Sequence, residues 1–250
     1  MKIYHRKGGA RLKSIGSKIA LIPAYMPAQP MLKTAHELTN DGFSVVIVND
    51  GSPGSFDGVF QEAEAFASVI TLTENQGKGE ALKAGLRFIR DNTAPPYTIV
   101  TVDADGQHRI DDVLRVFACA EKHPDDLVLG SRQLQKDAPV KSKIGNSITN
   151  FLHRVTTGMR LTDTQTGLRA FSDKSIDRVI RSGGSRYEYE MFMLLNFSRA
   201  KNIREVPIEA VYIDNNSASH FQPFKDSAKI YKVFFRYAFV RNEDKFNRKK

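Results

Sequence analysis

The chain has 250 residues, of which 41% are hydrophobic and 26% charged, and these values fit one large α/β domain, alone or with an appendage. Its single cysteine, Cys119, excludes a disulfide framework and offers no metal-ligand spacing. No window reaches the roughly 18 apolar residues that span a bilayer, and the N-terminus has charge without an apolar run. We therefore expect an intracellular protein that neither spans a membrane nor is secreted.

Apolar runs alternate with amphipathic segments from residue 18 to residue 130. The runs predict strands at residues 18–23, 43–48, 69–72, 98–102 and 126–130. The segments between them predict helices at about residues 30–40, 55–67, 79–90 and 110–121. This alternation predicts an α/β fold with a Rossmann-like, mostly parallel central sheet and helices on both faces.

Each predicted strand ends in polar or glycine-rich residues. In chain order these ends are Pro23-Ala24-Tyr25, Asn49-Asp50-Gly51-Ser52, Asn75-Gln76-Gly77-Lys78-Gly79, Asp103-Ala104-Asp105 and Gly130-Ser131-Arg132. Ligands of parallel sheets bind beyond the carboxyl ends of the strands, so we expect these five ends to form one site.

The sequence Asp103-Ala104-Asp105 follows a β-branched run and is trailed by Gly106 and Gln107. Two carboxylates and an amide supply the oxygen ligands that hard divalent cations prefer. Taken alone, Asp-x-Asp is more often a solvated turn after a strand. The other polar strand ends favour the metal site.

The turn at residues 75–79 carries neither of two familiar nucleotide signatures. The chain has no Gly-x-Gly-x-x-Gly after its first strand and no Gly-x-x-x-x-Gly-Lys-Ser/Thr. The turn can still be an anion-binding nest at a helix start, with Lys78 as a point charge, and a plain turn is an equal alternative.

Beyond Arg132 the pattern changes. A helix is predicted over about residues 141–158, and two short strands, 203–206 and 209–213, are predicted around Pro207. Asp163, in a threonine-rich turn, is either a helix cap or a site carboxylate. Glu188 and Glu190 open an apolar helix, where the helix dipole already explains an acidic first turn.

Positive charge gathers at the two ends of the chain. Residues 1–18 and residues 225–250 each carry a net charge of +6, which leaves −3 for residues 19–224. Between residues 223 and 240, four apolar residues recur at i, i+3, i+4 and i+7, namely Ile230, Val233, Phe234 and Tyr237. A helix packed on its own domain shows the same apolar face, but the adjoining basic stripe favours a helix at an anionic membrane surface.

The ordered strand-end motifs, together with residues 163–169 and His108, resemble glycosyltransferase family 2. Within that family the chain is most similar to dolichol-phosphate mannose synthase and the bacterial polyprenyl-phosphate glycosyltransferases, over about residues 18–232. The resemblance implies a GT-A fold, a nucleotide-diphosphate sugar donor, Mg²⁺ or Mn²⁺ as cofactor, and inversion at the anomeric carbon. The expected domains are a basic tail (1–17), the GT-A domain (18–222) and an amphipathic basic helix and tail (223–250).

The resemblance also assigns roles. Donor-binding positions would be Pro23, Ala24, Tyr25, Asp50, Gly77, Lys78, Asp103, Ala104, Asp105 and Lys225. The metal would be held by Asp105 and Gln107, with Asp103 beside it. Arg132, Lys143 and Ser147 would grip an acceptor phosphate, and the catalytic set is Asp103, Asp105, Arg132 and Asp163.

The chemistry of the acceptor decides whether a base is needed. A polyprenyl phosphate is already anionic, so positioning and charge neutralisation suffice. A saccharide hydroxyl must lose a proton, and Asp163 would then be the base, with Glu188 or Glu190 as weaker candidates.

The chain departs from its relatives at several points. Met26-Pro27 stands where many relatives have Asn-Glu, and Lys143 replaces an arginine and so loses a bidentate fork. Relatives often continue into transmembrane helices after the position of Val240, so here the amphipathic end or a membrane-embedded partner protein would supply the anchor. Residues 219–221 and Lys225 match a loop that closes over the donor phosphates.

The sequence therefore predicts transfer of a hexose to a dolichyl or undecaprenyl phosphate by a peripheral protein at the cytoplasmic face of the membrane. The first alternative is transfer to a saccharide hydroxyl in cell-surface polysaccharide synthesis. A nucleotidyltransferase would need a Gly-rich, Arg- and Lys-containing signature near the first strand, which is missing. We expect no nucleic-acid partner, because the basic residues avoid the central part of the chain and no recognition motif occurs.

Overall fold

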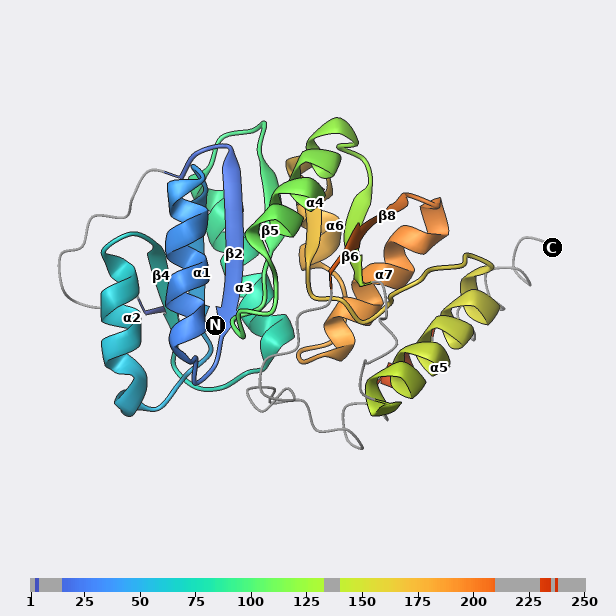
Figure 1. The fold of residues 1–250 in the computed structure, drawn as a ribbon, viewed down its shortest axis with the longest axis horizontal. Coiled ribbons are helices and arrows are strands. Elements are labelled where there is room, and N and C mark those ends of the chain that lie inside the picture. Colours follow the sequence, from blue (N-terminus) through green and yellow to red (C-terminus); the bar gives the residue numbers. More distant parts are fainter. Residues whose placement is uncertain (1–2, 5–14, 133–139, 210–229, 235–236, 238–250) are drawn as a thin grey trace.

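An eight-stranded, mostly parallel sheet forms the centre of the molecule (Figure 1). The computed structural model describes residues 3–4, 15–132, 140–209, 230–234 and 237. The strands are β1 (Ile3–Tyr4), β2 (Lys18–Ala24), β3 (Ser44–Asn49), β4 (Ser68–Leu72), β5 (Thr98–Thr101), β6 (Leu127–Arg132), β7 (Arg169–Ser172) and β8 (Ile203–Ile208). Their order is β1-β4-β3-β2-β5-β7-β6-β8.

The helices lie on both faces of this sheet, as the sequence predicts. They are α1 (Gln29–Asn40), α2 (Asp57–Glu64), α3 (Lys78–Asn92), α4 (Ile110–Lys122), α5 (Val140–Thr157), α6 (Ile176–Ile180) and α7 (Glu188–Ala200). Short 3₁₀ turns occupy Gly54–Phe56 and Asp173–Ser175. The predicted α/β class is therefore confirmed.

Strand periodicity divides the core into two halves. Ile19 and Leu21 of β2 face the side covered by α3, α6 and α7, whereas Ala20 and Ile22 face the side covered by α1, α2 and α4. All four side chains are fully buried. Continuous apolar runs are required because successive side chains of a doubly covered strand enter different halves of the core.

The largest difference from the sequence-based expectation is β7. The sequence suggested no strand at Arg169–Ser172, yet this segment lies between β5 and β6 and pairs antiparallel with both. Four residues are too few for periodicity to identify a strand. The insertion separates β5 from β6 and so widens the sheet beside the carboxyl end of β5.

Two predicted boundaries also change. The strand expected at 203–206 extends to Ile208 as β8 and continues through Pro207. Residues 210–213 of the second expected strand lie outside the described residues. Proline is tolerated there because β8, among the strands that the structure describes, lies at the edge of the sheet and pairs only with β6, in parallel. The helix expected over 55–67 begins as a 3₁₀ turn and ends at Glu64.

The two terminal segments contribute to the folded domain. Ile3 and Tyr4, in the expected tail, pair antiparallel with β4. Residues 230–234 are helical, and Ile230, Val233 and Phe234 are buried in the core half that contains α7. The Tyr237 hydroxyl donates to the Leu195 carbonyl at 3.3 Å. These four residues therefore pack on their own domain, which was the alternative to a membrane-facing stripe.

The remainder of the expected amphipathic segment lies outside the described residues. In the part of the chain that is described, no helix combines the length and the apolar character needed to cross a bilayer.

Candidate active site

Asp50 joins the end of β3 to the turn that starts α3. Its two carboxylate oxygens accept the backbone N–H groups of Gln76 and Gly77, both at 2.8 Å. Burial raises the pKa of the Asp50 carboxyl, and the two N–H groups oppose this rise. Ala24, at the end of β2, accepts the Asp50 backbone N–H at 2.8 Å. Asp50 thus holds two strand ends and the 75–77 turn together.

The start of α3 is packed rather than open. Gly77 has φ 98°, and a Cβ there would overlap the Arg186 side chain, while a Cβ at Gly79 would overlap Tyr189. The N–H of Glu80 donates to Ser185 at 2.9 Å. Since protein acceptors already occupy several N–H groups of this turn, the structure favours a turn over a backbone anion nest. The positive charge at this position comes from the Lys78 side chain.

Lys78 forms an ion cluster with Asp103 and Glu190. Its Nζ lies 2.7 Å from Asp103 Oδ1 and 3.1 Å from Glu190 Oε1. Burial opposes the charge of Lys78, but the two carboxylates raise its pKa. Burial would likewise raise the pKa of Asp103, but Lys78 and His108 together lower it. Lys78 and Asp103 are therefore both charged at neutral pH. The His108 Nε2 lies 3.3 Å from Asp103 Oδ2.

Asp105 lies two residues beyond Asp103 and is half-buried. Its Oδ1 accepts the Gln107 backbone N–H at 3.0 Å, across a turn in which Gly106 has φ 74°. Burial, and then the negative charge of Asp103, raise the pKa of the Asp105 carboxyl. A cation placed between the two aspartates would relieve that repulsion. 

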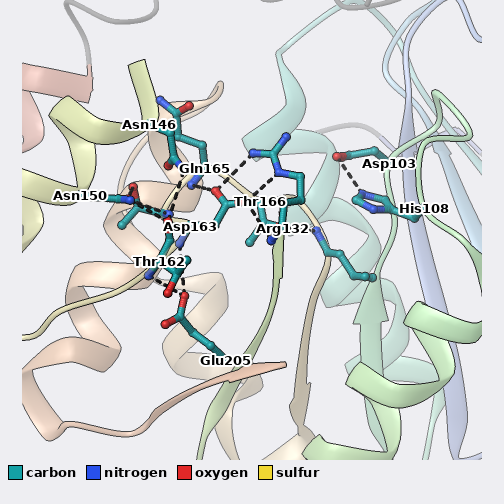
Figure 2. Close-up of polar contacts among 12 residues, drawn as sticks. Asp103, His108, Arg132, Asn146, Asn150, Thr162, Asp163, Gln165, Thr166 and Glu205 are labelled. Carbon is teal, nitrogen blue, oxygen red and sulfur yellow. Dashed lines mark hydrogen bonds and ion pairs between the residues drawn. The ribbon is translucent and has the colours of Figure 1, made fainter. Parts of the chain in front are cut away.

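Arg132 ends β6 and lies against Asp163 (Figure 2). Its Nε and Nη2 donate to Asp163 Oδ2 and Oδ1 at 2.6 and 3.2 Å, and its backbone N–H donates to Oδ2 at 3.3 Å. The Asp163 side chain is 0% exposed and that of Arg132 is 25% exposed. Asp163 also accepts the Gln165 N–H at 3.0 Å. The Asp163 carboxylate therefore fixes the Arg132 guanidinium through two N–H donors and accepts two backbone N–H groups as well.

Helix α5 and strand β8 hold the turn that carries Asp163 (Figure 2). Asn146 and Asn150 of α5 donate to the Thr162 carbonyl at 3.3 and 2.7 Å. Glu205 of β8 accepts the Thr162 and Asp163 N–H groups at 2.8 and 3.2 Å. The position of Arg132 therefore depends on α5 through the 162–165 turn.

A cavity of about 220 Å³ opens between these groups. It is lined by Lys78, Asp103, Arg132, Thr164, Gln165, Arg169, Tyr187, Glu190, Met191 and Ile230. A larger groove of about 800 Å³ runs along α1 and reaches Gly106 and His108, but none of Lys78, Asp103 and Arg132 lines it. Because the charged groups meet in the smaller cavity, we assign the candidate active site to it.

Arg169 is a buried cation behind this cavity. Its Nε donates to the Thr166 carbonyl at 3.0 Å and its Nη1 to the Glu190 carbonyl at 2.6 Å. Burial lowers its pKa, although neighbouring carboxylates oppose that effect. Next to it, a Cβ at Gly167 would overlap both carboxylate oxygens of Asp103. The backbone at Gly167 therefore packs directly against the Asp103 carboxylate.

The structure brings together part of the predicted set. Lys78, Asp103 and Arg132 line one cavity, and Asp163 supports it from behind. Pro23 and Ala24 are buried at the end of β2, and Tyr25 and Ala104 are half-buried. Ser147 is exposed on α5 and has no described contact that joins it to Arg132. The Lys143 side chain and Lys225 lie outside the described residues.

The sequence did not predict that Glu190, Arg169 and His108 lie close to Lys78 and Asp103. Glu190 was explained by the helix dipole, yet its carboxylate binds Lys78. One signal was available for Glu190. It stands at the start of a strongly apolar helix that is expected to be buried, and a buried carboxylate needs a cation nearby. No sequence signal indicated that Arg169 would be fully buried.

These elements define a class of protein. A doubly covered, mostly parallel sheet with a pair of aspartates and several cations at its carboxyl edge is the architecture of the GT-A fold. The solved structure of glucosyl-3-phosphoglycerate synthase from Mycobacterium tuberculosis with Mn²⁺, uridine diphosphate and glucosyl-3-phosphoglycerate has the same fold. Its TM-score is 0.64 at 16% identity, over 94% of this chain and 86% of that chain.

The chain belongs to glycosyl transferase family 2, whose model matches residues 20–181. A UDP-N-acetylglucosamine–dolichyl-phosphate N-acetylglucosaminyltransferase of Methanococcus voltae is 31% identical over 79% of this chain and 87% of its own length. An undecaprenyl-phosphate 4-deoxy-4-formamido-L-arabinose transferase of Salmonella choleraesuis is 27% identical over 70% of this chain and 52% of its own length. The protein is a glycosyltransferase.

Proposed function

We propose that this protein transfers a hexose from a nucleoside-diphosphate sugar to a polyprenyl phosphate, with inversion at the anomeric carbon. The observation that carries the proposal is Arg132, a guanidinium that lines the cavity beside Asp103 and is fixed by a buried carboxylate. The planar guanidinium suits a phosphate, which it can bind through two parallel N–H donors. The two similar proteins named for dolichyl and undecaprenyl phosphate support this acceptor class.

In this scheme the donor lies across the strand ends. Pro23, Ala24 and Tyr25 would line the base and ribose, and Asp50 would hold the turn beneath them. We keep Gly77 and Ala104 as donor positions on the strength of the resemblance, although the space beside Gly77 is occupied by Arg186 in this structure. The Lys78 ammonium, now bound to Asp103 and Glu190, would turn to the diphosphate. We include Lys225 as a further donor contact on the strength of the resemblance alone.

The residues present fit a divalent cation. The described residues contain no group of three or more His, Cys, Asp or Glu placed to hold a metal by themselves. Asp103, Asp105 and the side-chain oxygen of Gln107 offer hard oxygen ligands, and the donor diphosphate would complete the set. The repulsion that raises the pKa of Asp105 is what a cation would relieve. Mg²⁺ or Mn²⁺ would stabilise the charge on the departing diphosphate.

The reaction is a single displacement. An oxygen of the acceptor phosphate attacks the anomeric carbon of the sugar, and the bond from that carbon to the diphosphate oxygen breaks. The nucleoside diphosphate leaves with the electron pair. Arg132 orients the acceptor phosphate, with Lys143 and Ser147 as proposed further contacts on α5. Since the attacking oxygen is already anionic, no proton has to be removed.

Asp163 takes a different role from the one the sequence suggested for a hydroxyl acceptor. A general base must reach the proton that it removes, but the Asp163 side chain is 0% exposed and bound to Arg132 through three N–H groups. That geometry does not fit a base. We propose Asp163 as a positioning residue that acts through Arg132.

Transfer to a saccharide hydroxyl is the second candidate function. Glu190 lines the cavity with its side chain 10% exposed, so it could reach a hydroxyl if Lys78 moved away. Glu188 is a weaker base, because its Oε1 accepts the Ser185 N–H at 3.1 Å.

An acceptor panel separates the two functions. Purified protein, Mn²⁺ and radiolabelled nucleotide sugars would be incubated with undecaprenyl phosphate in detergent or with soluble oligosaccharides. We expect labelled lipid with the first acceptor and none with the second. Product formed only on the oligosaccharides would defeat the proposal. Asp105→Ala should abolish product in either case, while circular dichroism reports whether the fold is intact.

A further inference from the structure

Helix α5 carries an apolar stripe that faces away from the protein. Among the described residues, four large hydrophobic side chains are exposed, and three of them lie on α5. Ile148, Phe151 and Val155 are 41, 65 and 67% exposed. Their spacing of three and four residues places them on one face of the helix. Figure 1 shows α5 at the edge of the molecule, away from the sheet.

The opposite face of α5 is occupied by contacts with its own domain. Thr149 and His153 are buried, and the His153 Nε2 lies 2.8 Å from the Ser198 hydroxyl of α7. Asn146 and Asn150 hold the Thr162 carbonyl. In an ordinary surface helix the apolar face packs on the protein. In α5, polar side chains make many of the contacts with the protein, and three large apolar side chains face outward.

The charge of α5 favours an anionic surface as the occupant of this stripe. Its eighteen residues include Lys141, Lys143 and Arg154 and no Asp or Glu. Arg154 is exposed and follows Phe151 by three residues, which places the two on neighbouring parts of the helix surface. Outward apolar side chains flanked by cations without anions are typical of helices that lie in the headgroup region of a bilayer. A second protein would not require the exclusion of acidic residues.

The stripe is also connected to the site. Asn146 and Asn150, each two positions from Ile148, hold the turn that places Asp163 against Arg132. An acceptor whose phosphate reaches Arg132 and whose tail lies in a bilayer would therefore run past α5. Ile230, Val233 and Phe234 of the apolar stripe expected near the C-terminus are buried in the core and cannot serve this purpose.

We propose that the Ile148–Phe151–Val155 face of α5 docks the protein on an anionic lipid bilayer and so presents Arg132 to the membrane surface. This inference rests on the proposed function for its purpose, but it is tested without donor or acceptor. The full-length protein is mixed with vesicles of phosphatidylcholine, alone or with phosphatidylglycerol, and sedimented.

We expect the protein to sediment with the vesicles that contain phosphatidylglycerol and much less with phosphatidylcholine alone. Phe151→Ser should lower the partition coefficient about tenfold, because a mostly exposed phenyl ring no longer enters the lipid. Met26→Ser is the matched control: it removes an exposed apolar side chain far from α5 and should leave the partition unchanged. Circular dichroism reports whether each variant is folded.

Three results would overturn the proposal: no binding of the wild type to anionic vesicles, equal binding of Phe151→Ser, or an equal loss in Met26→Ser. Sedimentation velocity without lipid tests a second copy as occupant, and a dimer that Phe151→Ser dissociates would also overturn it. Transfer to a short, water-soluble polyprenyl phosphate separates this inference from the proposed function. Phe151→Ser should keep that activity and lose transfer to undecaprenyl phosphate in vesicles.

Discussion

Replacing Asp163 with asparagine tests whether this carboxylate positions Arg132. In the wild type, Asp163 accepts three N–H groups of Arg132, at 2.6, 3.2 and 3.3 Å. The amide keeps one acceptor oxygen, presents N–H groups where Oδ1 or Oδ2 was, and loses the charge. The guanidinium then loses its bidentate partner while 75% of its side chain stays covered.

The magnitude follows from the hydrogen bonds lost. Hydrogen bonds to charged groups contribute about 1.5–3 kcal/mol each. Asparagine loses one of the two side-chain hydrogen bonds and weakens the other by removing the negative charge, which together costs about 3 kcal/mol. This corresponds to a roughly 100-fold lower kcat/KM for the polyprenyl phosphate. We expect the loss mainly in the acceptor KM, with the donor KM nearly unchanged.

Initial rates against acceptor and donor concentration, over a range of pH, give the result. A positioning role predicts a pH profile with the shape of the wild type. If Asp163→Asn instead lowered kcat alone and removed the acidic limb of the profile, Asp163 would be a base and the reasoning would be refuted. Asp177→Asn is the control, because Asp177 forms an exposed ion pair with Arg90 at 3.0 Å and should leave the kinetics unchanged.

Two further predictions concern the fold and the donor site. Burial lowers the pKa of His153 from 6.5 to about 4, so the unfolded chain binds more protons between those values, and stability should fall by up to about 1.4 kcal/mol per pH unit as the pH drops through that range. Urea unfolding at several pH values measures the slope, which His153→Gln should reduce; an unchanged slope would contradict the assignment. Gly167→Ala should displace the Asp103 carboxylate and weaken donor binding at least about tenfold by calorimetry, whereas Gly58→Ala, where a Cβ meets open space, should bind normally.

Much of the fold could be predicted because its strands are covered on both faces. Continuous apolar runs identify such strands, and helices alternate between them, so the elements up to β6 lie close to the predicted bounds. Strand β7 could not be predicted in this way. It has four residues, and its place between β5 and β6 depends on antiparallel pairing that no local pattern encodes.

The site was predictable where a motif stands at a strand end and unpredictable where a distant element supplies a partner. Asp103 and Arg132 follow their strands directly. Glu190 reaches Lys78 from a helix 112 residues further along the chain, and local sequence explained it by the helix dipole instead. The same limit applies to Ile230 and its neighbours, whose periodicity fits a membrane face and a packed face equally until α7 is placed.

The proposal that Arg132 recognises the phosphate of a polyprenyl acceptor is tested most directly by binding. Farnesyl phosphate and farnesol share a tail and differ in the phosphate, and calorimetry measures each against the wild type and Arg132→Lys, which keeps the charge and loses the fork. We predict that the wild type prefers farnesyl phosphate and that Arg132→Lys loses most of this preference while it still binds the nucleotide sugar. Equal binding of phosphate and alcohol by the wild type, or an undiminished preference in Arg132→Lys, would contradict the account.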